Sequence, residues 1–335
     1  MSLWLASLGA KVQGYALAPE GENNLFDTAR VAETLKHTIG DIRNLADLER
    51  SIADFQPEIV FHMAAQPLVR RSYANPIETY STNVMGTAHV LDVVRRVPSV
   101  RATVVITTDK CYENREWLWG YREDDRLGGF DPYSNSKACA ELVTSSYLNS
   151  YFPPERFAEH QVALATARAG NVIGGGDWSE DRLIPDLVRG FLAGQPVKIR
   201  NPQAIRPWQH VLEPLAGYLA LAEHLLTGGA AFAGAWNFGP AEEDAWPVSR
   251  VAEAMAQAWG NNSRWTQDAA QGRHEAGYLK LDASKARNLL DWRPVLPIDL
   301  AILWLVEWFV AWQQSENMRD FTLQQIAQYE ARLSS

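Results

Sequence analysis

Cysteine is nearly absent from this sequence, whose 335 residues include only Cys111 and Cys139. The two cysteines form no C-x-x-C pair and no Cys/His ligand spacing, which excludes a disulfide framework and gives no support for a metal site. His62 and His210 also lie outside any metal-ligand spacing, so we interpret both as structural. Such low cysteine content is typical of a reducing compartment, and we expect the protein in the cytoplasm.

Excess positive charge and long apolar runs are also lacking. The chain carries 31 Lys and Arg residues against 40 Asp and Glu residues, a formal net charge of −9, so most of its surface would repel nucleic acid. The longest apolar run, residues 300–312, contains Glu307 and is about six residues too short to span a bilayer. We therefore expect a buried helix there, and neither nucleic acid nor a membrane as a partner.

The sequence contains no G-x-x-G-x-x-G turn. In doubly wound dinucleotide-binding folds such a turn follows the first strand, and its backbone N–H groups hold the pyrophosphate. The pattern of residues 2–8 is that of the second half of the helix after this turn, so we expect a truncated chain whose first strand and turn are encoded upstream. A genuinely shortened chain with damaged cofactor binding is the alternative. In both cases we expect weak dinucleotide binding and negligible turnover.

Secondary-structure signals are clear in the first half of the chain, where short β-branched runs alternate with longer amphipathic segments. Apolar residues at spacings of three and four predict helices in the longer segments, two of which begin with proline. This alternation predicts an α/β fold with a Rossmann-like, doubly wound parallel sheet. The predicted strands are residues 11–17, 37–40, 58–63, 101–108 and 161–167, and the predicted helices are residues 44–55, 76–97 and 132–151.

The pattern changes after about residue 170, where connections become rich in glycine and proline and tryptophan becomes frequent. This change predicts a second, smaller lobe that binds substrate. A further helix at 212–226 and strand at 235–239 indicate that the chain returns to the main sheet. We expect a dinucleotide-binding domain of residues 1–170 plus about 208–240, and a nucleotide-sugar-binding lobe of about 171–207 plus 241–335.

Tyr133 and Lys137 carry the most specific chemical signal. A spacing of four places both on one face of the helix predicted over 132–151, where an ammonium close to the phenol would favour its ionised form. A tyrosine in that setting can act as a base. The same spacing also occurs by chance on solvated helices. Thr108, Asp109 and Lys110 follow a predicted strand at the edge where such folds bind ligands, so we expect a shared pocket rather than a surface ion pair.

Several motifs resemble those of the extended short-chain dehydrogenase/reductases, and among them the nucleotide-sugar 4,6-dehydratases. The resemblance covers nearly the whole chain, and Asp-Lys after the strand-end threonine is similar to the CDP-glucose branch, whereas dTDP-glucose enzymes usually have Asp-Glu. The motifs are FHMAAQPLVRRSY (61–73), STNVMGT (81–87), TTDKCY (107–112), DPYSNSK (131–137), ARAGNVIGGGDW (167–178), RPWQHVLEPLAGYL (206–219) and WNFGP (236–240).

This resemblance implies NAD as cofactor and a set of site residues. The choice of NAD over NADP depends on the resemblance alone, because no acidic residue ends the strand at 11–17. Tyr133 would be the base, Lys137 its electrostatic partner, Thr108 a ligand of the sugar 4-hydroxyl, Asp109 the acid at the 6-hydroxyl and Lys110 a group near C5. The implied cofactor contacts are Asp41, Ile42, Ala64, Ala65, Gln66, Asn83, Tyr133 and Lys137, and the expected diphosphate and nucleotide contacts are Asn171 and Arg206.

The expected activity is that of a lyase converting CDP-glucose to CDP-4-keto-6-deoxyglucose and water, in deoxysugar or lipopolysaccharide biosynthesis. A 4-epimerase, or a dehydratase of another nucleotide sugar, is the runner-up, although an epimerase needs no acid at C6. The opposing hypothesis is a non-catalytic CDP-sugar-binding remnant. The resemblance also implies a homodimer, or a dimer of dimers, formed through the helices at 76–97 and 132–151, which have apolar residues on more than one face.

Overall fold

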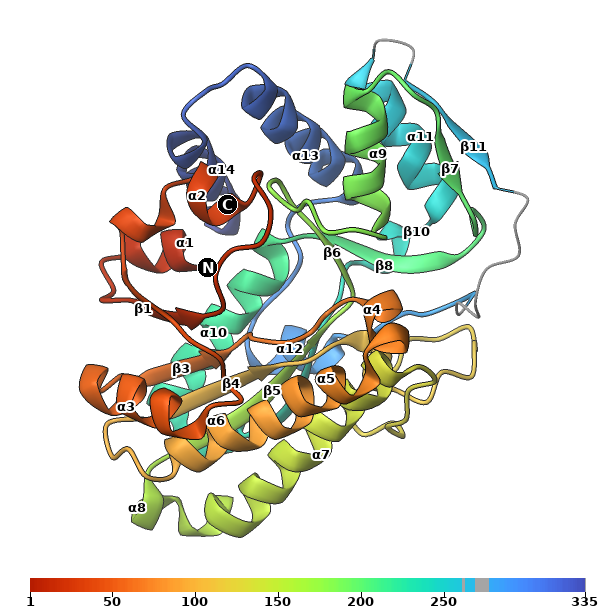
Figure 1. Cartoon of the computed structure of the whole chain (residues 1–335). Coiled ribbons are helices and arrows are strands. Elements are labelled where there is room, and N and C mark those ends of the chain that lie inside the picture. The colour runs from red at the N-terminus through yellow and green to blue at the C-terminus, as the bar shows by residue number, and fades with distance from the viewer. Residues whose placement is uncertain (261–262, 269–276, 335) are drawn as a thin grey trace.

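A parallel four-stranded sheet forms the centre of the larger lobe in the computed structural model, which describes residues 1–260, 263–268 and 277–334. Its strand order is β3-β4-β5-β9, and nearly every residue of β4 and β5 is buried. Helices cover both faces (Figure 1), which explains why these strands have continuous apolar runs. The strands are β3 (Ile59–His62), β4 (Ala102–Ile106), β5 (Ala163–Ala169) and β9 (Gly234–Phe238).

Helix α7 (Pro132–Tyr151) packs on this sheet and has the limits predicted from the sequence. It begins where Asp131 accepts a hydrogen bond from the backbone N–H of Ser134 at 3.0 Å and where proline stands at the first helical position. Helix α10 (Leu212–Gly228) contacts β4 and β5, and the chain then enters β9 as predicted. The main sheet is thereby completed by a segment from the second half of the chain.

The helix predicted over residues 76–97 is interrupted. The chain forms α5 (Pro76–Tyr80), a π-helical turn η2 (Ser81–Met85) and then α6 (Gly86–Val94). Within the turn, the Asn83 side chain exchanges two hydrogen bonds with the backbone of Gln66, at 2.8 and 3.0 Å. These bonds connect the helix to the loop after β3, and π turns of this kind frequently occur at functional sites.

Strands β1 (Gln13–Ala16) and β2 (Lys36–Ile39) form a separate parallel pair. Among the described residues no strand joins this pair to β3, so the parallel strands lie in two sheets rather than in one continuous sheet. Leu17 and Ile39, at the carboxyl ends of the pair, are more than half exposed. Helix α3 (Leu45–Phe55) packs against β1 and α6.

The smaller lobe combines two short sheets with helices α9 and α11, as Figure 1 shows. Helix α13 is the predicted buried helix, with Leu305, Trp308 and Phe309 in the core. In the described part of the chain, no helix is both long and apolar enough to cross a membrane. The elements are β6 (Asn171–Ile173), β8 (Ile205–His210), β10 (Ala245–Pro247), β7 (Val197–Ile199), β11 (Trp265–Gln267), α9 (Leu183–Leu192), α11 (Val248–Trp259), α13 (Ile298–Gln313) and α14 (Met318–Leu333).

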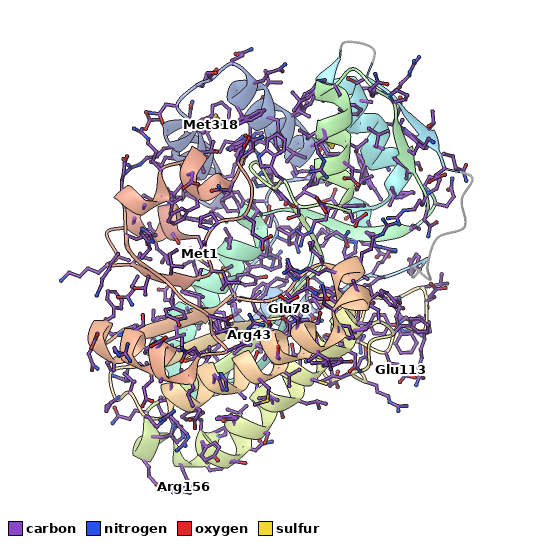
Figure 2. All side chains as sticks on the ribbon, viewed as in Figure 1. Met1, Arg43, Glu78, Glu113, Arg156 and Met318 are labelled. Carbon is purple, nitrogen blue, oxygen red and sulfur yellow. The ribbon has the colours of Figure 1, made fainter. Side chains whose placement is uncertain are left out.

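Short helices complete the chain, and side chains fill most of the space between the ribbons (Figure 2). The N-terminal helix packs on α14, where Trp4 meets Tyr329 edge to face. The short elements are α1 (Ser2–Ser7), α2 (Leu25–Thr28), η1 (Val31–Glu33), α4 (Val69–Ala74), η3 (Asp109–Cys111), η4 (Pro154–Arg156), α8 (Phe157–His160), η5 (Gly229–Phe232), η6 (Glu242–Asp244) and α12 (Ser284–Leu289).

Candidate active site

A cavity of about 1140 Å³ lies where the carboxyl ends of β4 and β5 face the smaller lobe. Its volume is in the upper range for small-molecule sites, which suits an elongated ligand. Both lobes line it, because the loop after β4 and the start of α7 form one wall and residues of β6 to β8 form the other. The structure brings together here six residues predicted from the sequence: Thr108, Asp109, Lys110, Tyr133, Asn171 and Arg206.

Asp109 is a buried carboxyl at this edge of the sheet. Its Oδ1 accepts a hydrogen bond from the Thr108 hydroxyl at 3.0 Å, whereas its Oδ2 has no partner in the described part of the chain. Burial raises the pKa of Asp109 above its ordinary value, although the charges of Lys110 and Arg206 and the Thr108 hydrogen bond oppose this change. A carboxyl that is held partly in its neutral form can donate a proton.

Tyr133 lies in the first turn of α7, where its backbone N–H donates to the Ser72 hydroxyl at 3.1 Å. Burial raises the pKa of Tyr133 to about 12, while a hydrogen bond with Thr108 and the positive charge of Arg182 oppose this rise. The Lys110 ammonium lies 6.0 Å from the centre of the phenol ring. Tyr133 is therefore a buried phenol with a threonine hydroxyl and two cations nearby.

Lys137 lies one turn further along α7, and its ammonium is held at the end of β4. Its Nζ donates a hydrogen bond to the Ile106 carbonyl at the end of β4, at 3.0 Å. Burial lowers the pKa of Lys137 to about 8. Thr108 and Arg182 both favour ionisation of Tyr133, and the Ile106 carbonyl is the hydrogen-bond partner of the Lys137 ammonium.

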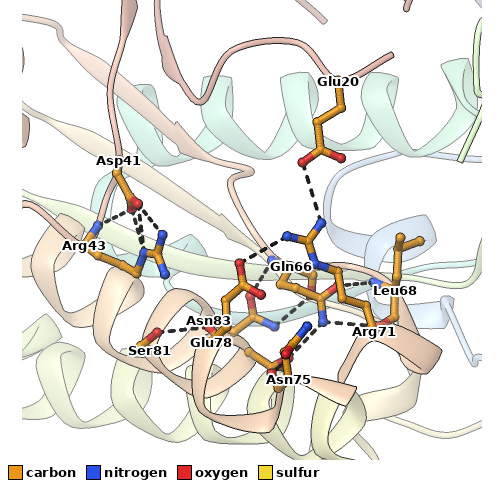
Figure 3. Close-up of polar contacts among 11 residues, drawn as sticks. Glu20, Asp41, Arg43, Gln66, Leu68, Arg71, Asn75, Glu78, Ser81 and Asn83 are labelled. Atoms are coloured by element: carbon orange, nitrogen blue, oxygen red, sulfur yellow. Dashed lines mark hydrogen bonds and ion pairs between the residues drawn. The ribbon is translucent and has the colours of Figure 1, made fainter. Parts of the chain in front are cut away.

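The residues predicted to contact the cofactor fall into two groups, which Figure 3 shows apart from each other. Gln66 and Asn83 form a closed network, in which Asn83 also donates to the Ser136 hydroxyl at 2.9 Å and Ser136 donates to the Tyr133 carbonyl at 2.7 Å. Asn83 thus connects the loop after β3 to the helix that carries Tyr133. Ala64 and Ala65 lie in that loop.

The second group lies after β2. Asp41 binds the Arg43 side chain through both carboxylate oxygens, with contacts of 2.5 to 3.0 Å, and this interaction lowers the pKa of Asp41 (Figure 3). The Ile42 side chain is buried, and a Cβ added at Gly86 would lie 2.3 Å from it. Ile42 could therefore reach a ligand only through its backbone.

The comparison with known families decides which protein class has this site. Residues 18–302 match the family model described as GDP-mannose 4,6 dehydratase. The chain belongs to this family. It is similar to a CDP-glucose 4,6-dehydratase of Salmonella typhimurium, with 54% identity over 329 residues that cover 98% of this chain and 92% of that relative.

Solved structures with the same fold include other nucleotide-sugar enzymes. The dTDP-glucose 4,6-dehydratase DesIV of Streptomyces venezuelae, solved with NAD, has a TM-score of 0.78 and 22% identity, covering 94% of this chain and 95% of that chain. A UDP-glucose 4-epimerase of Thermotoga maritima, solved with UDP-glucose, has a TM-score of 0.77 and 19% identity, covering 92% and 94%. These similarities confirm the predicted Rossmann-like α/β fold, and the family match confirms the predicted dehydratase family.

Sequence reasoning missed two arginines of the dehydratase that line the cavity. Arg182 is paired with Asp177 at 3.2 Å and lies close enough to Tyr133 to favour its ionised form. Arg70 of α4 forms a 2.5 Å ion pair with Asp181, so a side chain of the larger lobe is joined to the smaller lobe at the cavity. Arg182 lies outside the motifs quoted above, and Arg70 lies inside the 61–73 motif but at no spacing that implies a role. Only the fold brings the two arginines to the site.

Proposed function

We propose that this member of the family is a CDP-glucose 4,6-dehydratase that forms CDP-4-keto-6-deoxyglucose and water. The observation that carries the proposal is the buried Asp109 carboxyl with a free oxygen, beside Thr108 and Tyr133 in a cavity lined by both lobes. The 54% identity to the CDP-glucose enzyme supports the choice of substrate.

The reaction needs a base at the 4-hydroxyl, an acid at the 6-hydroxyl and a group that removes the C5 proton. Thr108 would hydrogen-bond the 4-hydroxyl, and Tyr133 would accept its proton. NAD, when bound, would supply the acceptor for the hydride of C4 and the donor of hydride to C6. The C4 ketone acidifies the C5 hydrogen, which Lys110 would remove as a proton, while Asp109 would protonate the 6-hydroxyl so that it leaves as water. Lys110 would return the proton to C5 when hydride reaches C6.

Proton transfer to Tyr133 requires that its phenolate be stabilised, because burial raises the pKa of the phenol to about 12. Thr108 and Arg182 already act in that direction. Lys137 lies one turn behind on the same face of α7, and we propose that its ammonium supplies part of the remaining stabilisation. Lys110 and Lys137 thus have separate roles, one at C5 and one at the phenol.

We propose sites on this chain for the nicotinamide and the adenine of NAD, but none for the pyrophosphate between them. Thr108 and Tyr133 line the cavity, where we place the nicotinamide beside the sugar, and Met63 also lines it. We place the adenine along Leu17 and Ile39, exposed apolar side chains at the carboxyl ends of β1 and β2. No glycine turn is present for the pyrophosphate.

Loss of three charge-assisted hydrogen bonds would weaken NAD affinity by roughly 10³-fold or more. We therefore expect calorimetric titration of this chain to show saturable binding of CDP and no micromolar binding of NAD. A micromolar NAD dissociation constant would show that the glycine turn is not needed.

For the nucleotide, Asn171 and Arg206 are the proposed contacts in the smaller lobe. A diphosphate requires donors and at least one cation, and both residues line the cavity. We also propose the domain division expected from the sequence, which is supported by the pairing of β9 with β5.

A homodimer formed through α5 to α7 is a further part of the proposal. Ile77, Met85 and Leu142 on these helices are 80%, 52% and 58% exposed, as expected of apolar side chains that a second copy covers. Light scattering at micromolar concentration would give the mass of a dimer if the proposal is correct and that of a monomer if it is wrong.

Product analysis tests the activity. The chain is incubated with CDP-glucose and with millimolar NAD, which is used to offset the weak cofactor binding that makes turnover negligible at lower concentrations. The 4-keto sugar is detected by its absorbance in alkali. The proposal predicts keto sugar from CDP-glucose in preference to dTDP-, GDP- or UDP-glucose, without net NADH. Stoichiometric NADH without keto sugar would contradict the proposal. A 4-epimerised product would also contradict it and would favour the epimerase, a reaction in which Asp109 has no role as the acid at C6.

A further inference from the structure

Helix α10 presents one face to the cavity. Val211, at the start of the helix, and Pro214, Leu215 and Tyr218 line the cavity together. Their spacing of three, four and seven residues is that of a single helical face. Three of the four side chains are apolar, so Tyr218 supplies the polar atom of this wall.

Tyr218 is held rigidly. Its side chain is 3% exposed, and its ring meets Phe238 of β9 edge to face, with centroids 5.5 Å apart and an interplanar angle of 82°. The adjacent Gly217 also contacts Phe238, since a Cβ there would lie 2.2 Å from that ring. The phenol can therefore approach the cavity in only one orientation.

The Tyr218 hydroxyl has no hydrogen-bond partner within residues 1–260, 263–268 and 277–334. Other buried tyrosines differ from it in this respect, because Tyr112 donates to Asn237 and Tyr329 donates to Glu213, both at 2.8 Å. Buried hydroxyls are normally paired, and an unpaired hydroxyl at a cavity wall calls for a ligand or water as its partner.

Tyr218 also lies near the reacting phenol. Tyr133 and Tyr218 line the same cavity. Burial raises the pKa of Tyr218, and negative charge on Tyr133 raises it further. Tyr218 consequently remains protonated when Tyr133 loses its proton, and it can act as a hydrogen-bond donor throughout.

We propose that Tyr218 is a further substrate-contacting residue, whose hydroxyl donates a hydrogen bond to the hexose of the nucleotide sugar beside Tyr133. This inference rests on the proposed function, because it takes the ligand to be a hexose linked to a nucleoside diphosphate. It assigns to α10 a contact with the sugar, whereas Asn171 and Arg206 contact the nucleotide and its diphosphate.

The test compares calorimetric titrations of CDP-glucose and CDP with the full chain and with Tyr218→Phe. The variant keeps the ring contact with Phe238 and removes one hydrogen bond, so we expect CDP-glucose affinity to fall about 3- to 10-fold while CDP affinity stays within about twofold. Tyr147→Phe, a change on α7 at a residue that does not line the cavity, is the control and should leave both affinities unchanged.

Thermal unfolding provides a second readout. Because the Tyr218 hydroxyl is unpaired, Tyr218→Phe should leave the unfolding temperature unchanged or slightly raised, whereas Tyr329→Phe should lower it. The inference would be overturned if parent and variant bound CDP-glucose with equal affinity, or if the variant lost as much affinity for CDP as for CDP-glucose. A parent chain that binds CDP-glucose no better than it binds CDP would contradict the proposed function itself, which the variant comparison alone would not.

Discussion

Two sets of buried polar side chains meet at helix α7, and they differ in how completely they are paired. The closed network consists of Glu141, Arg168, Thr107, Thr166, Tyr112 and Asn237. The open set consists of Thr108, Asp109, Tyr133 and Tyr218. Thr107 and Thr108 are consecutive residues that both line the cavity, yet Thr107 donates to Glu141 whereas Thr108 donates to Asp109.

Every polar group of the closed network has a protein partner. Arg168 donates through Nε and Nη2 to the two oxygens of Glu141 at 2.9 and 2.8 Å, and the two side chains are each 3% exposed. The two threonines donate to the same carboxylate, and Arg168 also donates to the Tyr112 hydroxyl at 2.7 Å. Such a network binds nothing else, and its removal would affect folding.

The open set leaves polar atoms available at the cavity. In the described part of the chain, Asp109 Oδ2 and the Tyr218 hydroxyl have no hydrogen-bond partner, and Tyr133 has a pKa raised by burial. These groups carry the cost of burial without full pairing in the protein, which is expected where a ligand completes the hydrogen bonds. Polar groups that are fully paired within the protein stabilise this fold, whereas polar groups that are incompletely paired act on a substrate.

The largest effect should come from the open set. Tyr133→Phe removes the group that accepts the 4-hydroxyl proton while keeping the packing of the ring. We expect turnover of CDP-glucose at millimolar NAD to fall by about 10² to 10⁴-fold, with an unchanged unfolding temperature. A variant with the turnover of the parent would assign the base to another residue.

Breaking the closed network should lower the stability of the fold, whereas Tyr133→Phe should lower the turnover. Glu141→Ala leaves the Arg168 guanidinium buried without a counter-ion, and we expect a loss of about 3–5 kcal/mol in the free energy of unfolding by denaturant. The exposed pair of Arg156 and Glu159 offers a matched control, since Glu159→Ala should cause no measurable change. If Glu141→Ala and Glu159→Ala were equally stable, the closed network would contribute no more to stability than an exposed ion pair does.

A pH experiment sharpens the comparison with a second fully paired carboxyl. Glu213 accepts hydrogen bonds from the Val295 and Leu296 backbone at 2.9 and 2.6 Å and from Tyr329, but burial raises its pKa from 4.5 to about 7. Between these two pH values the unfolded chain loses a proton that the folded chain keeps, so stability falls as pH rises. The expected difference is on the order of 3 kcal/mol.

Denaturant unfolding at pH 4.5 and pH 7.5 measures this change. Glu213→Gln cannot lose a proton, so the stability of that variant relative to the parent should increase across the interval. If parent and variant keep a constant difference at both pH values, Glu213 does not titrate as described. Asp109, whose pKa is also raised by burial, should instead affect the rate, which should fall as its carboxyl loses its proton at higher pH.

Much of this arrangement could be predicted from the sequence, for reasons that lie in short-range signals. The start of α7 is determined locally by Asp131 and Pro132, and the strand before Thr108 is a buried apolar run, so the meeting of Thr108 and Tyr133 at one sheet edge followed. The π turn could not be predicted, because it depends on bonds between Asn83 and the backbone of Gln66.

Other features depend on contacts between distant parts of the chain. Glu141 of α7 forms an ion pair with Arg168 of β5. Glu141 continues the spacing of Tyr133 and Lys137 along the helix, but no local signal in the sequence marks Arg168 as its partner. Tyr218 lies in an apolar helix and was indistinguishable from a core residue. The hydrogen bond from the Lys137 ammonium to the Ile106 carbonyl at the end of β4 also could not be predicted, because it is a contact between separate elements of the folded chain.

The central claim is that the open set carries out a redox-neutral 4,6-dehydration of CDP-glucose. The most direct test uses CDP-glucose with deuterium at C4, incubated with this chain and millimolar NAD, followed by mass spectrometry and NMR of the product. We predict CDP-4-keto-6-deoxyglucose with the deuterium at C6, because the hydride that leaves C4 is delivered to C6 within one turnover. Deuterium found in accumulated reduced cofactor, or retained at C4 of an epimerised sugar, would contradict it.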